Sequence, residues 1–385
     1  MKQKDDILSP SGVNVMCEAI EYLKKANILD KRQQSKVIHK LNEIIGISFF
    51  AMLGNADNYV EIEVFGREHE SALGEYFELA NGIPSHDTIE RAFAMLNPKF
   101  LEYFQSKFNE MLSNDEGEKI KKILSIDGKT QRGNSTETQK ANHIVSAVDE
   151  DGFCLGQVKA DDKTNEIRVI PELLDNLNIA GHIITTDAMG TQTEIVKKIR
   201  RKKADYVLAL KGNQESLHND VKLYFDDSIF LSDCAYHRTV EKARGGLEER
   251  EYWQADDISW LPQKKEWSGL MSIAMTRNTI TKNGKTTVEV RYFISSLCVN
   301  VKEIARAIRK HWVVESYHWH LDVTFREDDN RTIDKQAAYN LNVLRKLSLN
   351  ILKLLDVGRK NTSMKLKRYM ISLNPVKYFA KIMEL

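Results

Sequence analysis

The chain has 385 residues, of which 42% are hydrophobic and 29% charged, which is typical of a folded globular protein with more than one domain. The 56 Lys and Arg residues against 55 Asp and Glu residues give a formal net charge of +1, so the overall charge gives no argument for a nucleic-acid partner. The four cysteines lack metal-binding spacing, and no segment has the pattern of a signal peptide or a membrane span. We therefore expect a cytoplasmic protein with reduced thiols.

Residues 1–120 are predicted to form a helical N-terminal domain. Apolar residues recur at helical intervals over residues 36–53, Ser85 or Asp87 supplies an N-cap for the segment that follows, and Pro98 opens a further helix. Such a bundle suits DNA binding, and it suits a structural or dimerising role equally well.

Residues 121–214 alternate between strand and helix patterns. Short apolar runs predict strands at 122–127, 143–148, 153–159, 182–187 and 205–210, with helices at 165–177 and 191–203 between them. This order is that of a ribonuclease-H-like mixed α/β sheet, in which the first and fourth strands lie side by side. The first run ends in Asp127 and the fourth in Asp187, so the two carboxylates are predicted to meet at neighbouring strand tips.

The second half of the chain interrupts and then completes this core. Residues 215–300 read as a β-rich insertion, with a turn at Asn283 and Gly284. Residues 301–356 return to helices and form the second part of the core, and 357–385 form a basic C-terminal tail. Within 308–329, one helix is predicted whose common face carries His311, Glu315 and Asp322.

Two aspartates at adjacent strand tips repel each other, which raises a pKa or calls for a divalent cation between them. Carboxylates and water recruit Mg²⁺, and a pair of such ions is the usual means of phosphodiester cleavage and transfer. Glu315, on a helix beside the sheet, is suited to be the third acid, and Asp322 is the second choice. The sequence thus predicts a site for two Mg²⁺ ions, with Mn²⁺ as a substitute.

Motifs in the same segments are shared with a known family. They are IDGKTQRG at 126–133, HIVSAV at 143–148, LGQ at 155–157, KTNEI at 163–167, TTDAMGTQ at 185–192, DYVLALKGNQ at 205–214 and HWVVESYHWHLDVTFRED at 311–328. With GNADNYVEIEVFG and NGIPSHDT near the N-terminus, they resemble bacterial insertion-sequence DDE transposases of the group related to H-repeat-associated proteins. The resemblance implies Asp127, Asp187 and Glu315 as the catalytic acids.

Two departures from the family pattern concern DNA contacts. The superfamily has Tyr, Arg and Lys around the glutamate where this chain has Ile308, His311 and Asp322, so we expect Asp322 to bind a metal or to pair with Arg309. In the insertion, the usual His-Gly-Arg is replaced around Arg244, whereas Glu248 and Arg250 are retained. The predicted DNA-binding residues are Lys129, Arg132, Lys211, Arg244, Arg250, Arg309, His311 and His318. In the tail, Arg359, Lys360, Lys365, Lys367 and Arg368 are further candidates for contacts with phosphates.

The resemblance implies a transposase that binds the terminal inverted repeats of an insertion sequence and catalyses metal-dependent strand cleavage and strand transfer. Its partners would be double-stranded repeat and target DNA, on the nucleoid of a bacterial cytoplasm, with a homodimer in the DNA complex and no membrane. Two other functions remain open: a catalytically silent DNA-binding protein derived from a transposase, and a structure-selective metal-dependent nuclease.

Overall fold

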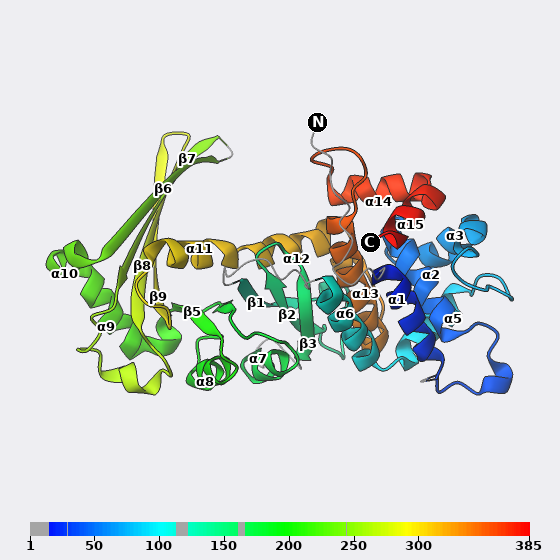
Figure 1. Ribbon diagram of the computed structural model, residues 1–385, viewed down its shortest axis with the longest axis horizontal. Coiled ribbons are helices and arrows are strands. Elements are labelled where there is room, and N and C mark those ends of the chain that lie inside the picture. Colours follow the sequence, from blue (N-terminus) through cyan, green and yellow to red (C-terminus); the bar gives the residue numbers. More distant parts are fainter. Residues whose placement is uncertain (1–14, 29, 113–121, 161–165, 244) are drawn as a thin grey trace.

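The computed structural model describes residues 15–28, 30–112, 122–160, 166–243 and 245–385. It contains a nine-stranded mixed sheet, which occupies the left and central parts of the view in Figure 1. The strand order is β3-β2-β1-β4-β5-β9-β8-β7-β6. The strands are β1 (Ile123–Thr130), β2 (His143–Asp149), β3 (Cys154–Ala160), β4 (Ile183–Thr186), β5 (Asp205–Leu210), β6 (Ala235–Ala243), β7 (Gly246–Ala255), β8 (Ser272–Lys282) and β9 (Lys285–Ser295). The predicted β-rich segment thus extends the sheet, because β9 pairs antiparallel with β5.

Strands β1 and β4 are parallel neighbours, as the sequence predicts. Their register pairs Ile123 with Ile183 and ends with Ile126 opposite Thr186, so Asp127 and Asp187 are the next residues on the two strands. One detail of the prediction is wrong: β1 does not end at Asp127. It continues to Thr130, because β2 pairs with it antiparallel along its whole length.

Helices cover both faces of the sheet. They are α7 (Glu166–Asp175), α8 (Thr193–Arg201), α9 (Glu215–Asp226), α10 (Ser228–Asp233), α11 (Val301–His311) and α12 (Val313–Val323). Figure 1 shows α7 and α8 on one side of the sheet, and α11 followed by α12 on the other. Alternate residues of β1 follow this division: Leu124 and Ile126 pack with the buried residues of α7 and α8, whereas Ile123 packs with those of α11.

The predicted single helix over residues 308–329 is two helices in the structure. Helix α11 ends at His311, helix α12 begins at Val313, and Trp312 lies between them with a ψ of −7°. After α12 the chain turns through Arg326, whose φ of 46° is left-handed, into the short 3₁₀ helix η7 (Glu327–Asp329). The acids at the end of this segment therefore leave the helix axis and point back towards the sheet.

The helices before Ile123 share a hydrophobic core with the last third of the chain. They are α1 (Val15–Leu23), α2 (Leu41–Leu53), α3 (Tyr59–Glu68), α4 (Glu70–Leu73), α5 (His86–Met95) and α6 (Pro98–Leu112). Helix α13 (Lys335–Leu354) runs through this core and is buried nearly all round. Two of its buried amides donate hydrogen bonds inside this core: Asn340 to the carbonyls of Phe93 and Leu96, and Asn350 to the carbonyl of Cys154.

The predicted basic tail contains two packed helices, α14 (Met364–Leu373) and α15 (Pro375–Met383). Arg368 is fully buried, and its guanidinium donates to the carbonyls of Met52 and Ala56 and to the carboxylate of Asp57. Lys367 donates to two carbonyls at the end of α13. The prediction that these two residues contact phosphates is wrong, because both charges are used inside the protein. In the described parts of the chain, no helix is both long and apolar enough to cross a membrane.

Candidate active site

Asp127 and Asp187 lie on the face of the sheet that α11 and α12 cover. Both follow the alternation set by Ile123 and Ile183, which pack under α11. A cavity of about 360 Å³ opens at this point, and its lining includes Asp127, Asp187 and Glu315. The structure thus brings to one cavity three acids that span 188 positions of the sequence, from Asp127 to Glu315.

The acids interact unfavourably in the absence of a cation. Burial, together with the negative charge of Asp187 and smaller contributions from Glu166 and Glu315, raises the pKa of Asp127 from 3.8 to about 7. Burial also raises the pKa of Glu315, against the effect of the Arg291 guanidinium. Two negatively charged carboxylates this close together repel each other, and a hard divalent cation bound between them would remove that repulsion.

The residues that could hold a metal ion here are a pair of carboxylates, Asp127 and Asp187, and a third acid, Glu315, that lines the same cavity. Among the residues that the structure describes, no three His, Cys, Asp or Glu side chains are grouped closely enough to hold an ion as they stand. Asp187 is exposed, and its carboxylate accepts a hydrogen bond from the Gly190 amide at 3.2 Å. Glu315 is also exposed. Oxygen donors of this type suit Mg²⁺ and Mn²⁺.

Two histidines flank the acids and are neutral. His318 Nδ1 lies 3.5 Å from Asp127 Oδ2, and burial, with nearby lysines, lowers the pKa of His318 to about 3. His311 Nδ1 is 3.0 Å from Thr185 Oγ1, and burial lowers the pKa of His311 to about 4. The structure therefore places both predicted DNA-binding histidines against the sheet, where neither carries a positive charge at neutral pH.

A second cavity, of about 340 Å³, adjoins the first and shares Arg291, Trp312 and Glu315 with it. Arg250 and Arg309 line it, as the sequence analysis expects of DNA-binding residues. Arg250 forms ion pairs with Glu241 at 3.1 Å and with Glu248, and Arg309 lies 3.5 Å from Glu241. The guanidinium groups are thus already held by glutamates of the protein.

Arg291 is a site residue that the sequence analysis missed. Its guanidinium lies 4.5 Å from the centre of the Trp312 ring and forms an ion pair with Glu289 at 2.8 Å. It lines both cavities. The alternation of β9 makes Arg291 face the same side as Glu289, but nothing in the sequence says which side of β9 faces the acids.

The remaining predicted DNA contacts fall in different surroundings. Lys211 is exposed and lines the cavity that holds the acids. Arg132 is also exposed, with its Nε 3.8 Å from Asp328. Lys129 is only 11% exposed and forms ion pairs with three carboxylates. Arg244 lies outside the described residues.

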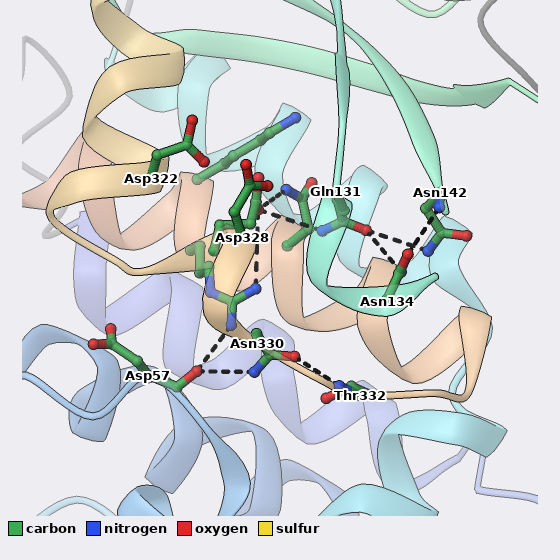
Figure 2. A network of polar contacts seen from close by, with 12 residues as sticks. Asp57, Gln131, Asn134, Asn142, Asp322, Asp328, Asn330 and Thr332 are labelled. Atoms are coloured by element: carbon green, nitrogen blue, oxygen red, sulfur yellow. Dashed lines mark hydrogen bonds and ion pairs between the residues drawn. The ribbon is translucent and has the colours of Figure 1, made fainter. Parts of the chain in front are cut away.

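The sequence analysis suggested that Asp322 pairs with Arg309, but the structure does not contain this pair. The Asp322 carboxylate lies 2.7 Å from Lys129 Nζ, and Arg309 lies near Glu241 instead. Arg309 and Asp322 are 13 positions apart on successive helices, about 20 Å at 1.5 Å per residue, which is too far for an ion pair, and α12 packs on β1. Figure 2 shows Asp322 close to Asp328. Glu327, which shares Lys129 with these two acids, contacts Gln131 on one side and Arg345 on the other, and Arg345 donates to the carbonyl of Asp57.

A buried histidine–glutamate pair beside Asp127 also escaped the sequence analysis. His143 Nε2 lies 2.5 Å from Glu166 Oε1, and His143 Nδ1 lies 2.8 Å from Thr130 Oγ1. A Cβ atom on Gly128 would lie 2.4 Å from Glu166 Oε1, so this pair occupies the space that a side chain would need. The signal was present, because His143 and Glu166 belong to two of the motifs quoted above.

Comparison with known proteins shows the family of the chain. Residues 118–351 match the family model described as "Transposase DDE domain", and residues 21–108 match the one described as "DDE_Tnp_1-associated". The chain belongs to the DDE transposase family.

Relatives within the family extend over most of the chain. The putative transposase YncI of Escherichia coli O157:H7 is 37% identical over 357 residues, which cover 90% of each chain. The H repeat-associated putative transposase YhhI of E. coli (strain K12) is 37% identical over 336 residues, which cover 84% of this chain and 88% of YhhI. A shorter match, 44% identical over 62 residues, which cover 16% of this chain and 74% of the relative, is to the inactive transposase YbfQ of E. coli (strain K12).

Proposed function

We propose that this protein is an active transposase that binds the terminal inverted repeats of an insertion sequence and catalyses metal-dependent DNA cleavage and strand transfer. The observation that carries the proposal is the register of β1 and β4, which sets Asp127 and Asp187 side by side in the cavity that Glu315 also lines. The strand order β3-β2-β1-β4-β5 supports a ribonuclease-H-like core for residues 121–214 and 301–356.

Asp127, Asp187 and Glu315 would hold two Mg²⁺ ions, for which Mn²⁺ could substitute. When bound, such ions activate the attacking oxygen and stabilise the leaving oxygen of a phosphodiester. In the first reaction, water adds to the phosphorus and the bond to the 3′ oxygen breaks, which leaves a 3′-hydroxyl on the element. In the second, this 3′-hydroxyl attacks a phosphodiester of target DNA, forming one P–O bond as another breaks.

The protein's own residues orient the acids and the DNA. Neutral His318, against Asp127 Oδ2, limits the directions in which that carboxylate can turn without adding a positive charge to a cation site. Lys211 and Arg291, at the wall of the cavity, are placed to neutralise a phosphate. Joining two element ends requires two such cavities, so we propose a homodimer in the DNA complex.

The test is cleavage of a duplex that carries the element's own terminal repeat, with Mg²⁺ or Mn²⁺. We expect the wild-type protein to nick the strand at the repeat boundary and Asp187→Ala to lose this activity while still binding the duplex. Asp233→Ala, which changes an exposed acid at the end of α10, is the matched control and should cleave normally. Equal cleavage by wild type and Asp187→Ala would overturn the proposal.

The same experiment separates the two other functions. A catalytically silent protein would bind the repeat without any product, and the inactive relative YbfQ makes this comparison necessary. A structure-selective nuclease would cut junctions or flaps whatever the end sequence. A shuffled repeat and a flap substrate, assayed in parallel, distinguish these outcomes.

A further inference from the structure

Lys129 is the common partner of three acids that follow Glu315 in the chain. Its Nζ lies 2.7 Å from Asp322 Oδ1, 3.1 Å from Glu327 Oε2 and 3.2 Å from Asp328 Oδ1. Its side chain is 11% exposed, so little of the ammonium group is left for solvent or DNA. One lysine of β1 thus connects the catalytic strand to the end of α12 and to η7.

The spacing of the residues shows what this connection fixes. Asp127 and Lys129 are two residues apart on β1 and therefore point to the same face of the sheet. Glu315 and Asp322 are seven residues apart on α12, about two turns, and lie on the same side of the helix. Strand β1 and helix α12 therefore face each other at two successive positions: Asp127 and Glu315 at the first, and the ion pair of Lys129 with Asp322 at the second.

Lys129 is itself held from behind by a buried carboxylate. Glu327 is fully buried, and its Oε1 accepts hydrogen bonds from Gln131 Nε2 at 3.3 Å and from Asn342 Nδ2. Arg345 Nη1 lies 3.9 Å from the same oxygen. Because Asn342 and Arg345 belong to α13, the lysine is tied to the central helix of the core and cannot swing towards solvent without leaving Glu327 underpaired.

We propose that Lys129 is a positioning residue: its ion pairs hold α12 in the register on β1 that brings Glu315 to the same metal ion as Asp127 and Asp187. This inference rests on the proposed function. It replaces the expected contact between Lys129 and a DNA phosphate, because three acids surround the ammonium group. Figure 2 shows two of them, Asp322 and Asp328, close to each other.

The sign of one measurable quantity separates positioning from simple electrostatics. A cation beside a cation site opposes metal binding, so charge alone predicts that removing Lys129 makes Mn²⁺ bind more tightly. Loss of positioning predicts the opposite. Residues that orient metal ligands typically change metal affinity by about 10- to 100-fold when they are replaced, and that is the weakening we expect.

The experiment measures Mn²⁺ binding to the full chain without DNA, by isothermal titration calorimetry and by the rise of Tm with Mn²⁺ concentration. The variants are Lys129→Met and the double variant Lys129→Met/Glu327→Gln. The double variant leaves no buried glutamate without its lysine and keeps the net charge, so it remains informative if the single variant does not fold. Lys367→Met is the matched control: it removes another buried lysine, on α14, which donates to carbonyls at the end of α13, and it should leave Mn²⁺ affinity unchanged.

A second arm asks whether Lys129 acts through Glu315. Glu315→Ala should weaken Mn²⁺ binding, and adding Lys129→Met to Glu315→Ala should weaken it no further. Unchanged or tighter binding by both Lys129 variants, or additive effects with Glu315→Ala, would overturn the inference. The proposed function fails separately, namely if Asp127→Ala and Asp187→Ala bind Mn²⁺ and cleave the repeat as the wild type does.

Discussion

Replacing Asp127 with Asn is expected to stabilise the metal-free protein at neutral and alkaline pH, although it should abolish catalysis. Burial and the negative charge of Asp187 raise the pKa of Asp127 to about 7, so the folded state resists ionisation of this carboxyl. The unfolded chain ionises it near the usual 3.8. The folded protein therefore binds this proton more tightly than the unfolded chain, and stability falls as the pH rises from about 4 to about 7.

The size of the effect follows from the two pKa values. A difference between 3.8 and about 7 corresponds to about 4 kcal/mol of unfolding free energy lost above pH 7. The side chain of Asp127 is 27% exposed, and water screens part of the repulsion. We therefore expect Asp127→Asn to gain about 1–3 kcal/mol over the wild type at pH 8. The difference between the two proteins should be smallest below pH 4, where the wild-type carboxyl is protonated in both states.

The assay is urea unfolding of both proteins at pH 4, 6 and 8, with EDTA and with Mn²⁺. With Mn²⁺ at pH 8, the wild type should be the more stable of the two proteins, because the ion binds to it and stabilises it, whereas the variant lacks one of the ligands. Asp187→Asn should behave similarly, and the double variant should gain less than the sum of the single ones, because either change removes the repulsion. A metal-free Asp127→Asn that is less stable than the wild type at pH 8 would refute the reasoning.

Three further outcomes are expected. Gly128→Ala should lower the unfolding free energy by about 1–3 kcal/mol and should also slow cleavage, because the added methyl group would clash with the buried pair of His143 and Glu166. Gly212→Ala is the control: its methyl group would point into open space, so urea unfolding and cleavage should not change. Asp57→Ala should cost about 3–5 kcal/mol in urea unfolding, because it leaves a fully buried arginine without its carboxylate. Glu194→Ala removes only an exposed ion pair and should leave the unfolding curve nearly unchanged. Glu241→Gln should tighten duplex binding and steepen its salt dependence in fluorescence anisotropy titrations, because it frees Arg309 and removes one of the two glutamates that hold Arg250. Looser binding would contradict this.

The sheet core could be predicted from sequence because its signals are local. Strands β4 and β5 are short apolar runs bounded by polar residues, and the structure places them within one residue of the predicted ends. The neighbourhood of β1 and β4 was predicted from the order of the elements, β-β-β-α-β-α-β, which is that of a ribonuclease-H-like sheet. Together these rules were sufficient to predict that Asp127 and Asp187 lie side by side, before any distance was known.

Long-range pairing is what the sequence could not supply. Lys129 looked like a free cation just past a strand, yet its three acids lie about 200 positions further along the chain. Arg368 looked like part of a basic tail, yet its carboxylate partner Asp57 lies between α2 and α3, more than 300 positions earlier in the chain. A charged side chain is buried only where partners converge on it, and neither periodicity nor local composition reports such convergence.

The near-zero net charge is compatible with DNA binding because of how the charges are paired. Arg250 and Arg309 line the second cavity but share Glu241, and Arg291 is held by Glu289. Counted over the chain, these pairs cancel. In space, each guanidinium already lies at the cavity beside the three candidate acids. An entering phosphate has to displace the half-exposed Glu241 from Arg309, and both Glu241 and the less exposed Glu248 from Arg250. Whole-chain charge therefore says little about this site, whereas the exposure of its acidic partners determines which arginines DNA can recruit.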